Sequence, residues 1–156
     1  MDFTENKEFE RRCAELAEQH DYNLYDLVLY DNGRLYRYEH QRANPWNNSY
    51  SVSKMFTMAA IGFLYDEGKI DLDESVCALL ADEIKIKVSD EWKGVTVRHA
   101  LAHKMGIDHS SPKNEEITMQ YDAKDFLSHV LSDKIVHTPG EFYCYSDGAY
   151  YILSRI

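Results

Sequence analysis

A serine and a lysine one helical turn apart are the residues of this sequence best suited to covalent chemistry. Ser51 and Lys54 stand at the start of a segment, residues 55–64, that is apolar almost all round. The i,i+3 spacing brings the hydroxyl and the amine to the same side of a first helical turn. The backbone N–H groups there have no intrahelical partner, and the helix dipole is positive. A base beside a hydroxyl and a donor for an oxyanion are what nucleophilic acyl transfer requires.

The same spacing also has a simple structural interpretation, in which Ser51 caps a helix and Lys54 extends its amine to the surface. A second copy of the spacing, Ser110 to Lys113, lies in a polar run with no apolar helix behind it, which is typical of a loop. Only Ser51 opens a segment with no polar face. Such a helix is expected to be buried in the middle of a domain.

Composition limits the classes of partner. The chain has 156 residues, 44% of them hydrophobic, which favours one domain or a piece of a larger one. A net charge of −10 argues against nucleic acid and against an anionic membrane surface as partners. Cys13, Cys77 and Cys144 are odd in number and widely spaced, so free thiols in a reducing compartment are expected.

The sequence shows neither a signal peptide nor a membrane-spanning segment. Residues 1–5 contain no basic region and no apolar core of a signal peptide. No apolar run approaches the length of a membrane span. The chain as written is therefore expected to be cytoplasmic.

The first half of the chain is predicted to contain two helices and a hairpin. Thr4 is a candidate cap for a helix over residues 4–20. Residues 25–30 and 34–39 read as strands, joined by a tight turn at Asn32-Gly33. The helix that opens at Ser51 is predicted to end at Gly68.

The second half is predicted to be mainly helical. A short helix is expected near residues 75–81, and a longer one from a cap at Thr96 to near Gly106. Residues 122–131 predict another helix, opened by Asp122. A final helix is predicted from Asp147 to the end of the chain.

Two patterns resemble metal sites only superficially. The acids of residues 69–74 lack the spacing and the glycine of a calcium-binding loop. His99 and His103 have a zinc-like spacing, but Ala100 stands where a metalloprotease helix carries its glutamate. The histidines are therefore interpreted as structural, and no metal or other cofactor is expected.

Four stretches, taken together and in order, resemble one known family. They are residues 51–54, residues 68–73, residues 96–107, and Pro139-Gly140 followed by residues 145–150. This order and spacing is similar to that of the serine β-lactamase-like proteins of the class C type, with the related DD-peptidases and esterases. The last stretch resembles the family's second catalytic motif, Tyr-x-Asn. The resemblance covers about residues 20–156.

The resemblance implies a fold and a set of roles. The fold would be α/β (α+β) and β-lactamase/transpeptidase-like, with residues 1–156 forming one partial domain that is rich in helices and has an N-terminal β-hairpin. Ser51 would be the nucleophile of an acyl-enzyme mechanism, and its backbone N–H would be one oxyanion donor. Lys54 and Tyr145 would handle its proton, and desolvation would lower the pKa of Lys54. Which of the two is the base stays open.

Two departures from the family pattern bear on function. Asp147 stands at the asparagine position of the second motif, where it would contact substrate. A carboxylate only accepts hydrogen bonds, so Asp147 should bind an amide carbonyl poorly, pair with Lys54 and hold it protonated. We therefore expect an ester substrate, a peptide substrate or weak turnover rather than the hydrolysis of acylamino β-lactams.

The second departure concerns a missing motif. The family's third motif, Lys/His-Thr/Ser-Gly on a strand, does not occur in the sequence. In relatives it lies C-terminal to the second motif, with further strands of the sheet. We therefore expect an N-terminal portion of such a protein, weak or inactive as a catalyst by itself. A second chain is a candidate to complete the sheet.

Three interpretations of function remain open. The first is a serine hydrolase that acts on an amide, ester or β-lactam carbonyl of a small-molecule or peptide substrate. The second is a non-catalytic protein of the same fold that binds a peptide, a cell-wall fragment or a partner chain. The third is an unrelated acidic interaction domain. Members of the family are often exported, so the resemblance favours export, whereas the N-terminal sequence favours a cytoplasmic location.

Overall fold

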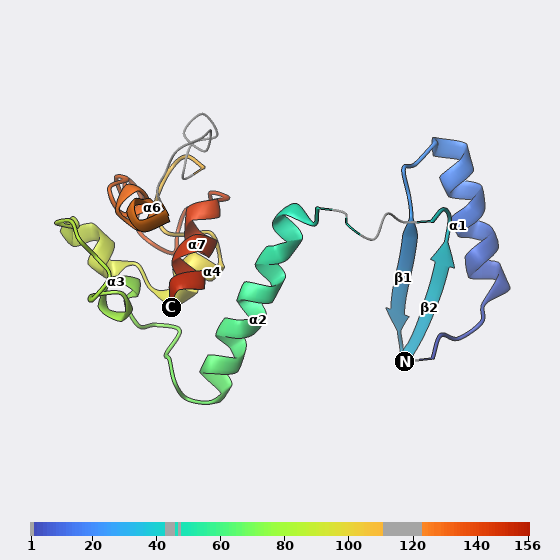
Figure 1. Ribbon diagram of the computed structural model, residues 1–156, viewed down its shortest axis with the longest axis horizontal. Helices are drawn as coiled ribbons and strands as arrows, with labels where there is room; N and C mark the ends of the chain where they lie inside the picture. Colours follow the sequence, from blue (N-terminus) through green and yellow to red (C-terminus); the bar gives the residue numbers. More distant parts are fainter. Residues whose placement is uncertain (1, 43–45, 47, 111–122) are drawn as a thin grey trace. The chain divides into compact units, whose positions relative to one another are not determined.

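The computed structural model describes residues 2–42, 46, 48–110 and 123–156. The chain divides into two compact units, Met1–Ser49 and Tyr50–Ile156 (Figure 1). Each unit is described by itself below, and the expectation of a single partial domain over residues 1–156 stays a prediction. All residues of the candidate site lie in the second unit.

The first unit begins with a helix that starts later than predicted. Helix α1 runs from Lys7 to His20, and the side chain of Asn6 caps it by accepting the N–H of Phe9 at 3.0 Å. Thr4 is therefore not the cap. Its own N–H donates to the carbonyl of Leu35 at 2.6 Å, which keeps this residue extended beside a strand and outside the helix.

The predicted hairpin is confirmed. Strands β1 (Asp26–Asp31) and β2 (Arg34–Glu39) pair antiparallel. Asn32 and Gly33 have φ angles of 47° and 80°, as a two-residue type I′ turn requires at both central positions. Helix α1 lies beside β2 (Figure 1), with the rings of Phe9 and Tyr36 5.9 Å apart.

The second unit opens with the segment that carries the serine and the lysine. A turn of 3₁₀ helix, Tyr50–Val52, leads into helix α2, Ser53–Asp66. The N–H of Lys69 bonds to the carbonyl of Leu64, and the N–H of Gly68 to that of Tyr65, each at 2.9 Å. With a φ of 66° at Gly68, this is a Schellman ending, so the predicted end of the helix is confirmed.

The prediction that this helix is buried on all sides is wrong. Ile61 is its buried residue, whereas Phe56 and Phe63 are 74% and 69% exposed. The half-buried positions Lys54, Thr57 and Leu64 share a stripe with Ile61 at i,i+3/i+4 spacing, so one side of α2 is covered. The apolar composition of α2 indicates that burying it is favourable. Because all of its sides are apolar, the sequence does not indicate which side packs against the rest of the unit.

Helix α7 is central to the second unit. It runs from Asp147 to Arg155 and contacts α2, α4 (Val97–Leu101) and α6 (Ala123–Leu131) (Figure 1). The short helix α3, Val76–Leu79, and a 3₁₀ turn, Asp90–Gly94, complete the unit. The buried core collects apolar residues from these elements and from the segments between them, including Val76, Trp92, Val95, Val97, Ala100, Met105, Ile107, Val130 and Ile152.

Two helices in this unit start where the sequence predicted, α4 after a cap at Thr96 and α7 at Asp147. The hydroxyl of Thr96 accepts the N–H of His99 at 3.3 Å at the start of α4, and that of Ser146 accepts the N–H of Ala149 at 3.2 Å at the start of α7. Asp122, the predicted start of α6, lies outside the described residues.

Helix α4 is shorter than predicted. It ends at Leu101, well before Gly106, because the backbone turns into the left-handed region at His103, where φ is 54°. His99 and His103 are therefore not on one helix.

Two expectations about composition can be compared with the structure. Cys13, Cys77 and Cys144 are free thiols, as predicted. Within the described ranges of the chain, no helix is both long and apolar enough to cross a membrane.

Candidate active site

Ser51 and Lys54 meet at the start of α2. Ser51 lies in the 3₁₀ turn and Lys54 in the first turn of the α-helix. The Nζ of Lys54 donates a hydrogen bond to Oγ of Ser51 at 3.2 Å. The turn is fixed locally, since Tyr50 has a φ of 46° and its carbonyl accepts the hydroxyl of Ser53 at 2.8 Å. Ser51 itself is exposed, so a substrate can approach its oxygen.

Tyr145 reaches the same oxygen from the other end of the unit. Its hydroxyl donates to Oγ of Ser51 at 2.6 Å, although the two residues are 94 positions apart in the sequence. Its ring also lies 5.0 Å from the ammonium of Lys54, close enough for a cation–π attraction. The structure therefore brings together all three residues for which the family resemblance implies a catalytic role.

Asp147 joins this group through Lys54. It is the first residue of α7, where the helix dipole favours a carboxylate, and its Oδ1 accepts a hydrogen bond from the ammonium of Lys54. The side chain of Lys54 is 15% exposed, whereas that of Asp147 is 43% exposed. A ligand can therefore reach the carboxylate more easily than the amine.

The electrostatics of Lys54 differ from the expectation of a lowered pKa. Burial does lower the pKa of this amine, but its hydrogen bonds to Asp147 and Tyr145 and the negative charge of Asp147 raise it more. The net pKa of Lys54 lies above its usual range, so the amine is held as an ammonium. The pairing that was expected between Lys54 and Asp147 is present.

The arrangement has the parts for acyl transfer to a hydroxyl. Oγ of Ser51 accepts from an ammonium and from a phenol, so negative charge on that oxygen would be stabilised from two sides. Either Lys54 or Tyr145 can take the serine proton once it has lost its own. The positive end of the α2 dipole lies beside the same oxygen.

The contact between His103 and Tyr145 could not be predicted from the sequence. His99 lies in α4, where its Nδ1 accepts the N–H of Thr96 at 3.3 Å and completes a capping box. His103 lies beyond α4, and its ring stacks on that of Tyr145 with the centroids 4.7 Å apart. The position of His103 in the third family-like stretch was visible in the sequence, but its contact with Tyr145 depends on how the chain folds back.

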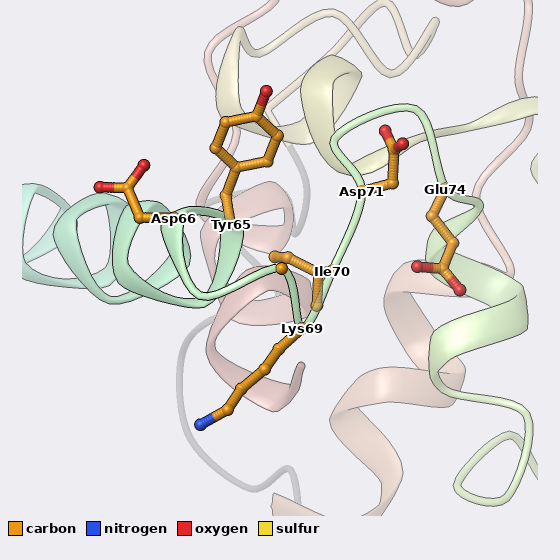
Figure 2. Close-up of a pocket in the computed structure, with 7 residues that line it drawn as sticks. Tyr65, Asp66, Lys69, Ile70, Asp71 and Glu74 are labelled. Carbon is orange, nitrogen blue, oxygen red and sulfur yellow. The ribbon is translucent and has the colours of Figure 1, made fainter.

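A pocket in this unit lies away from Ser51, Lys54, Tyr145 and Asp147. It has a volume of about 590 Å³ and is lined by residues at the end of α2 and on the segment that follows, among them Tyr65, Asp66, Asp71 and Glu74 (Figure 2). This is the segment whose acids resemble a calcium loop. Among the described residues, no group of three or more histidines, cysteines or acids is arranged to hold a metal ion.

Comparison with curated proteins gives a remote relative. Protein flp of Staphylococcus aureus is 27% identical over 107 residues, which is 68% of this chain and 21% of that protein. The chain thus spans about a fifth of the length of the curated relatives that it matches.

Solved structures share the fold. A class C beta-lactamase in complex with cefoxitin matches 94% of this chain and 41% of its own, with a TM-score of 0.66 and 17% identity. A D-stereospecific amidohydrolase from Streptomyces sp. matches 96% of this chain and 48% of its own, with a TM-score of 0.64 and 20% identity.

The family model described as Beta-lactamase matches residues 15–156, which is most of the chain. Together with the structural neighbours, this match confirms the predicted β-lactamase/transpeptidase-like fold, of which the described residues contain the helices and a two-stranded sheet. The chain therefore belongs to the Beta-lactamase family.

Proposed function

We propose that this chain carries the nucleophilic half of a serine hydrolase that works through an acyl-enzyme. The observation that carries the proposal is the pair of hydrogen bonds on Oγ of Ser51, from Lys54 at 3.2 Å and from Tyr145 at 2.6 Å. Covalent catalysis by a hydroxyl requires a base within hydrogen-bond reach of the nucleophile, and here two candidate groups are in reach.

The proposed reaction has two steps. Oγ of Ser51 adds to a substrate carbonyl as its proton passes to Lys54 or Tyr145, and the same proton then goes to the leaving nitrogen or oxygen as the acyl–leaving-group bond breaks. Water hydrolyses the resulting ester of Ser51 and releases the acid. The base stays open between the two residues, but Lys54 must first lose the proton that Asp147 helps it to keep.

The chemistry of Asp147 narrows the proposed substrate. A carboxylate offers only acceptors, and one oxygen is already paired with Lys54. It would therefore receive an N–H or O–H of the substrate rather than an amide carbonyl, which favours esters and peptides over acylamino β-lactams. Since the chain spans about a fifth of its curated relatives, a further segment or a second chain is proposed to complete the sheet and to strengthen weak turnover.

A second candidate function rests on the same ion pair. Asp147 holds Lys54 in its charged form, and an ammonium does not accept the serine proton. A protein of this fold with that arrangement could bind a peptide, a cell-wall fragment or a partner chain without turnover. Binding without acylation is the outcome that would favour this candidate.

The test is covalent labelling of Ser51. The chain is incubated with p-nitrophenyl acetate and, separately, with a fluorescent penicillin, and the adduct is located by mass spectrometry of peptides. We expect an acyl group on Ser51, formed faster from the ester than from the penicillin. A folded chain that gains no adduct from either reagent contradicts the proposal and favours the binding candidate.

A matched pair of variants controls for nonspecific labelling. Ser51→Ala should abolish the adduct. Ser132→Ala removes another exposed hydroxyl that bonds in the same way to the carbonyl three residues earlier, that of His129, but lies outside the Ser51 turn, and it should label like the parent chain. Equal labelling of the parent chain and Ser51→Ala would show that the nucleophile is another residue.

A further inference from the structure

Tyr145 sits in an irregular segment, yet its two neighbours in the sequence are both bonded to one residue. The N–H of Cys144 donates to the carbonyl of His103 at 2.9 Å. The N–H of Ser146 donates to Nδ1 of the His103 ring at 3.1 Å. Between these two bonds, the imidazole stacks on the phenol ring of Tyr145, with centroids 4.7 Å apart and planes at 26°. His103 thus holds Tyr145 by the backbone on either side and by the ring.

These contacts restrict the backbone on both sides of Tyr145 as well as its ring. Residues 142–146 are in neither helix nor strand, and Tyr145 is 40% exposed. A phenol on such a segment samples several rotamers unless neighbouring groups restrict it. The 2.6 Å bond to Ser51 requires one of them. Among the contacts that the structure describes, those of His103 restrict both the backbone beside Tyr145 and its ring.

The backbone of His103 bears a cost that fits this role. Its φ of 54° lies in the left-handed region, which is unfavourable for a residue with a Cβ. Such conformations persist where the surrounding structure over-determines them, and they cluster at functional sites. Here the conformation lets one residue present both its carbonyl and its ring nitrogen to the segment that carries Tyr145.

The bond from Ser146 also sets the protonation state of the ring. Nδ1 can accept an N–H only when it carries no proton, so the imidazole must be neutral with its hydrogen on Nε2. Burial, and then the positive charge of Lys54, lower the pKa of His103 and favour this form. Asp147 and the backbone of Ser146 act on this pKa in the opposite direction but are outweighed. The phenols of Tyr143, Tyr145 and Tyr150 also face the ring.

We propose that His103, as a neutral imidazole, is the positioning residue that holds the Tyr145 hydroxyl on Ser51, and that protonation of its ring releases Tyr145. This inference rests on the proposed acylation of Ser51 and adds a residue to its machinery. In this proposal His103 acts on the reaction through Tyr145.

Two substitutions separate the acceptor from the rest of the ring. His103→Asn puts an amide oxygen near the place of Nδ1, does not titrate, and tolerates a positive φ. His103→Gly removes both the acceptor and the stacking ring while easing the backbone, so the variant is expected to fold. His99→Asn is the matched control, because His99 makes the same kind of bond to a backbone N–H but at the cap of α4.

The measurement is the rate of Ser51 acylation by p-nitrophenyl acetate between about pH 5 and about pH 9, a range that spans histidine titration. Misplacement of Tyr145 should slow His103→Gly about ten- to a hundred-fold, whereas His103→Asn and His99→Asn should keep most of the parent rate. The ratio of the His103→Asn rate to the parent rate should rise as the pH falls, because only the parent loses the bond to Ser146. Taking this ratio cancels the pH dependence that both chains share.

A second readout does not depend on activity. The ¹H–¹⁵N amide signal of Ser146 should titrate with His103 in the parent chain, stay constant over that range in His103→Asn, and exchange faster with solvent in His103→Gly. The inference is overturned if His103→Gly acylates at the parent rate, if His103→Asn is as slow as His103→Gly, or if the Ser146 signal is the same in all variants. If the parent chain is not acylated at all, the proposed function fails, and the Ser146 signal alone decides whether His103 holds the segment.

Discussion

Replacing Tyr145 with phenylalanine removes one oxygen and leaves the rest of the site in place. The ring keeps its stacking on His103 at 4.7 Å and its contact with the ammonium of Lys54 at 5.0 Å. What is lost is the hydrogen bond to Oγ of Ser51 at 2.6 Å. The variant therefore measures what the hydroxyl contributes to acylation.

The expected effect on rate is large and the effect on stability small. A positioned proton-transfer group contributes about 10²- to 10⁴-fold, which corresponds to about 3–5 kcal/mol of activation free energy. The net value of one hydrogen bond to folding is about 0.5–1.5 kcal/mol, and this one lies at the surface, so the free energy of unfolding should change by the low end of that range or less. Acylation should fall steeply in a chain that is still folded.

The assay is the single-turnover rate of acylation with p-nitrophenyl acetate, followed by release of p-nitrophenolate and by the mass of the Ser51 peptide. Tyr143→Phe is the matched control, since it removes a hydroxyl from the same segment and keeps the ring edge that faces His103. Urea denaturation of both variants reports folding. An acylation rate for Tyr145→Phe within about threefold of the parent would refute the assignment of Tyr145 to proton transfer.

Three further perturbations have defined outcomes. Asp147→Asn keeps an acceptor oxygen but removes the negative charge that raises the pKa of Lys54, so the pKa should fall and the pH–rate profile of acylation should move to lower pH; a move to higher pH would contradict the assigned ion pair. Because the folded-state pKa of Lys54 is raised, the pair stabilises the parent below the unfolded-state pKa of lysine, and this contribution is lost as the pH rises through the folded-state value. Trp92→Ala should lower the free energy of unfolding by about 3–5 kcal/mol in urea denaturation, since Trp92 is fully buried and its Nε1 donates to the carbonyl of Asp133 at 2.8 Å. A loss under about 1 kcal/mol would show that the core is not packed as described. Gly106→Ala should destabilise more than Gly68→Ala. Both residues have positive φ, but a Cβ at Gly106 would collide with the carbonyl oxygen of His137, whereas Gly68 has open space; equal thermal shifts would remove that distinction.

Local signals in the sequence predicted local structure well. Asn32-Gly33 specifies its turn because both residues adopt positive φ readily, and Gly68 ends α2 for the same reason. The start of α1 was misplaced because Thr4 and Asn6 are both good caps. Only the bond from Thr4 to the carbonyl of Leu35, a contact between distant residues, decides between them.

The burial of α2 shows where sequence reasoning ends. Its apolar composition indicates that exposure is unfavourable, but which residues cover it depends on packing. In the described structure, contacts cover the stripe of Lys54 and Ile61 and leave Phe56 and Phe63 exposed. For the candidate site, family-like spacing pointed to Ser51, Lys54, Tyr145 and Asp147, whereas the contact of His103 with Tyr145 needed coordinates.

The two bonds that join α2 to the start of α7 also have a consequence for folding. Ser51 with Tyr145 and Lys54 with Asp147 span 94 and 93 positions. Closing so long a stretch costs chain entropy before any contact rewards it, and such pairings slow the approach to the native state. These groups should therefore be among the last in the molecule to come together. An acylating reagent added during refolding would label Ser51 only in chains that have formed these contacts. The rate at which labelling appears would therefore report the rate of this late folding step.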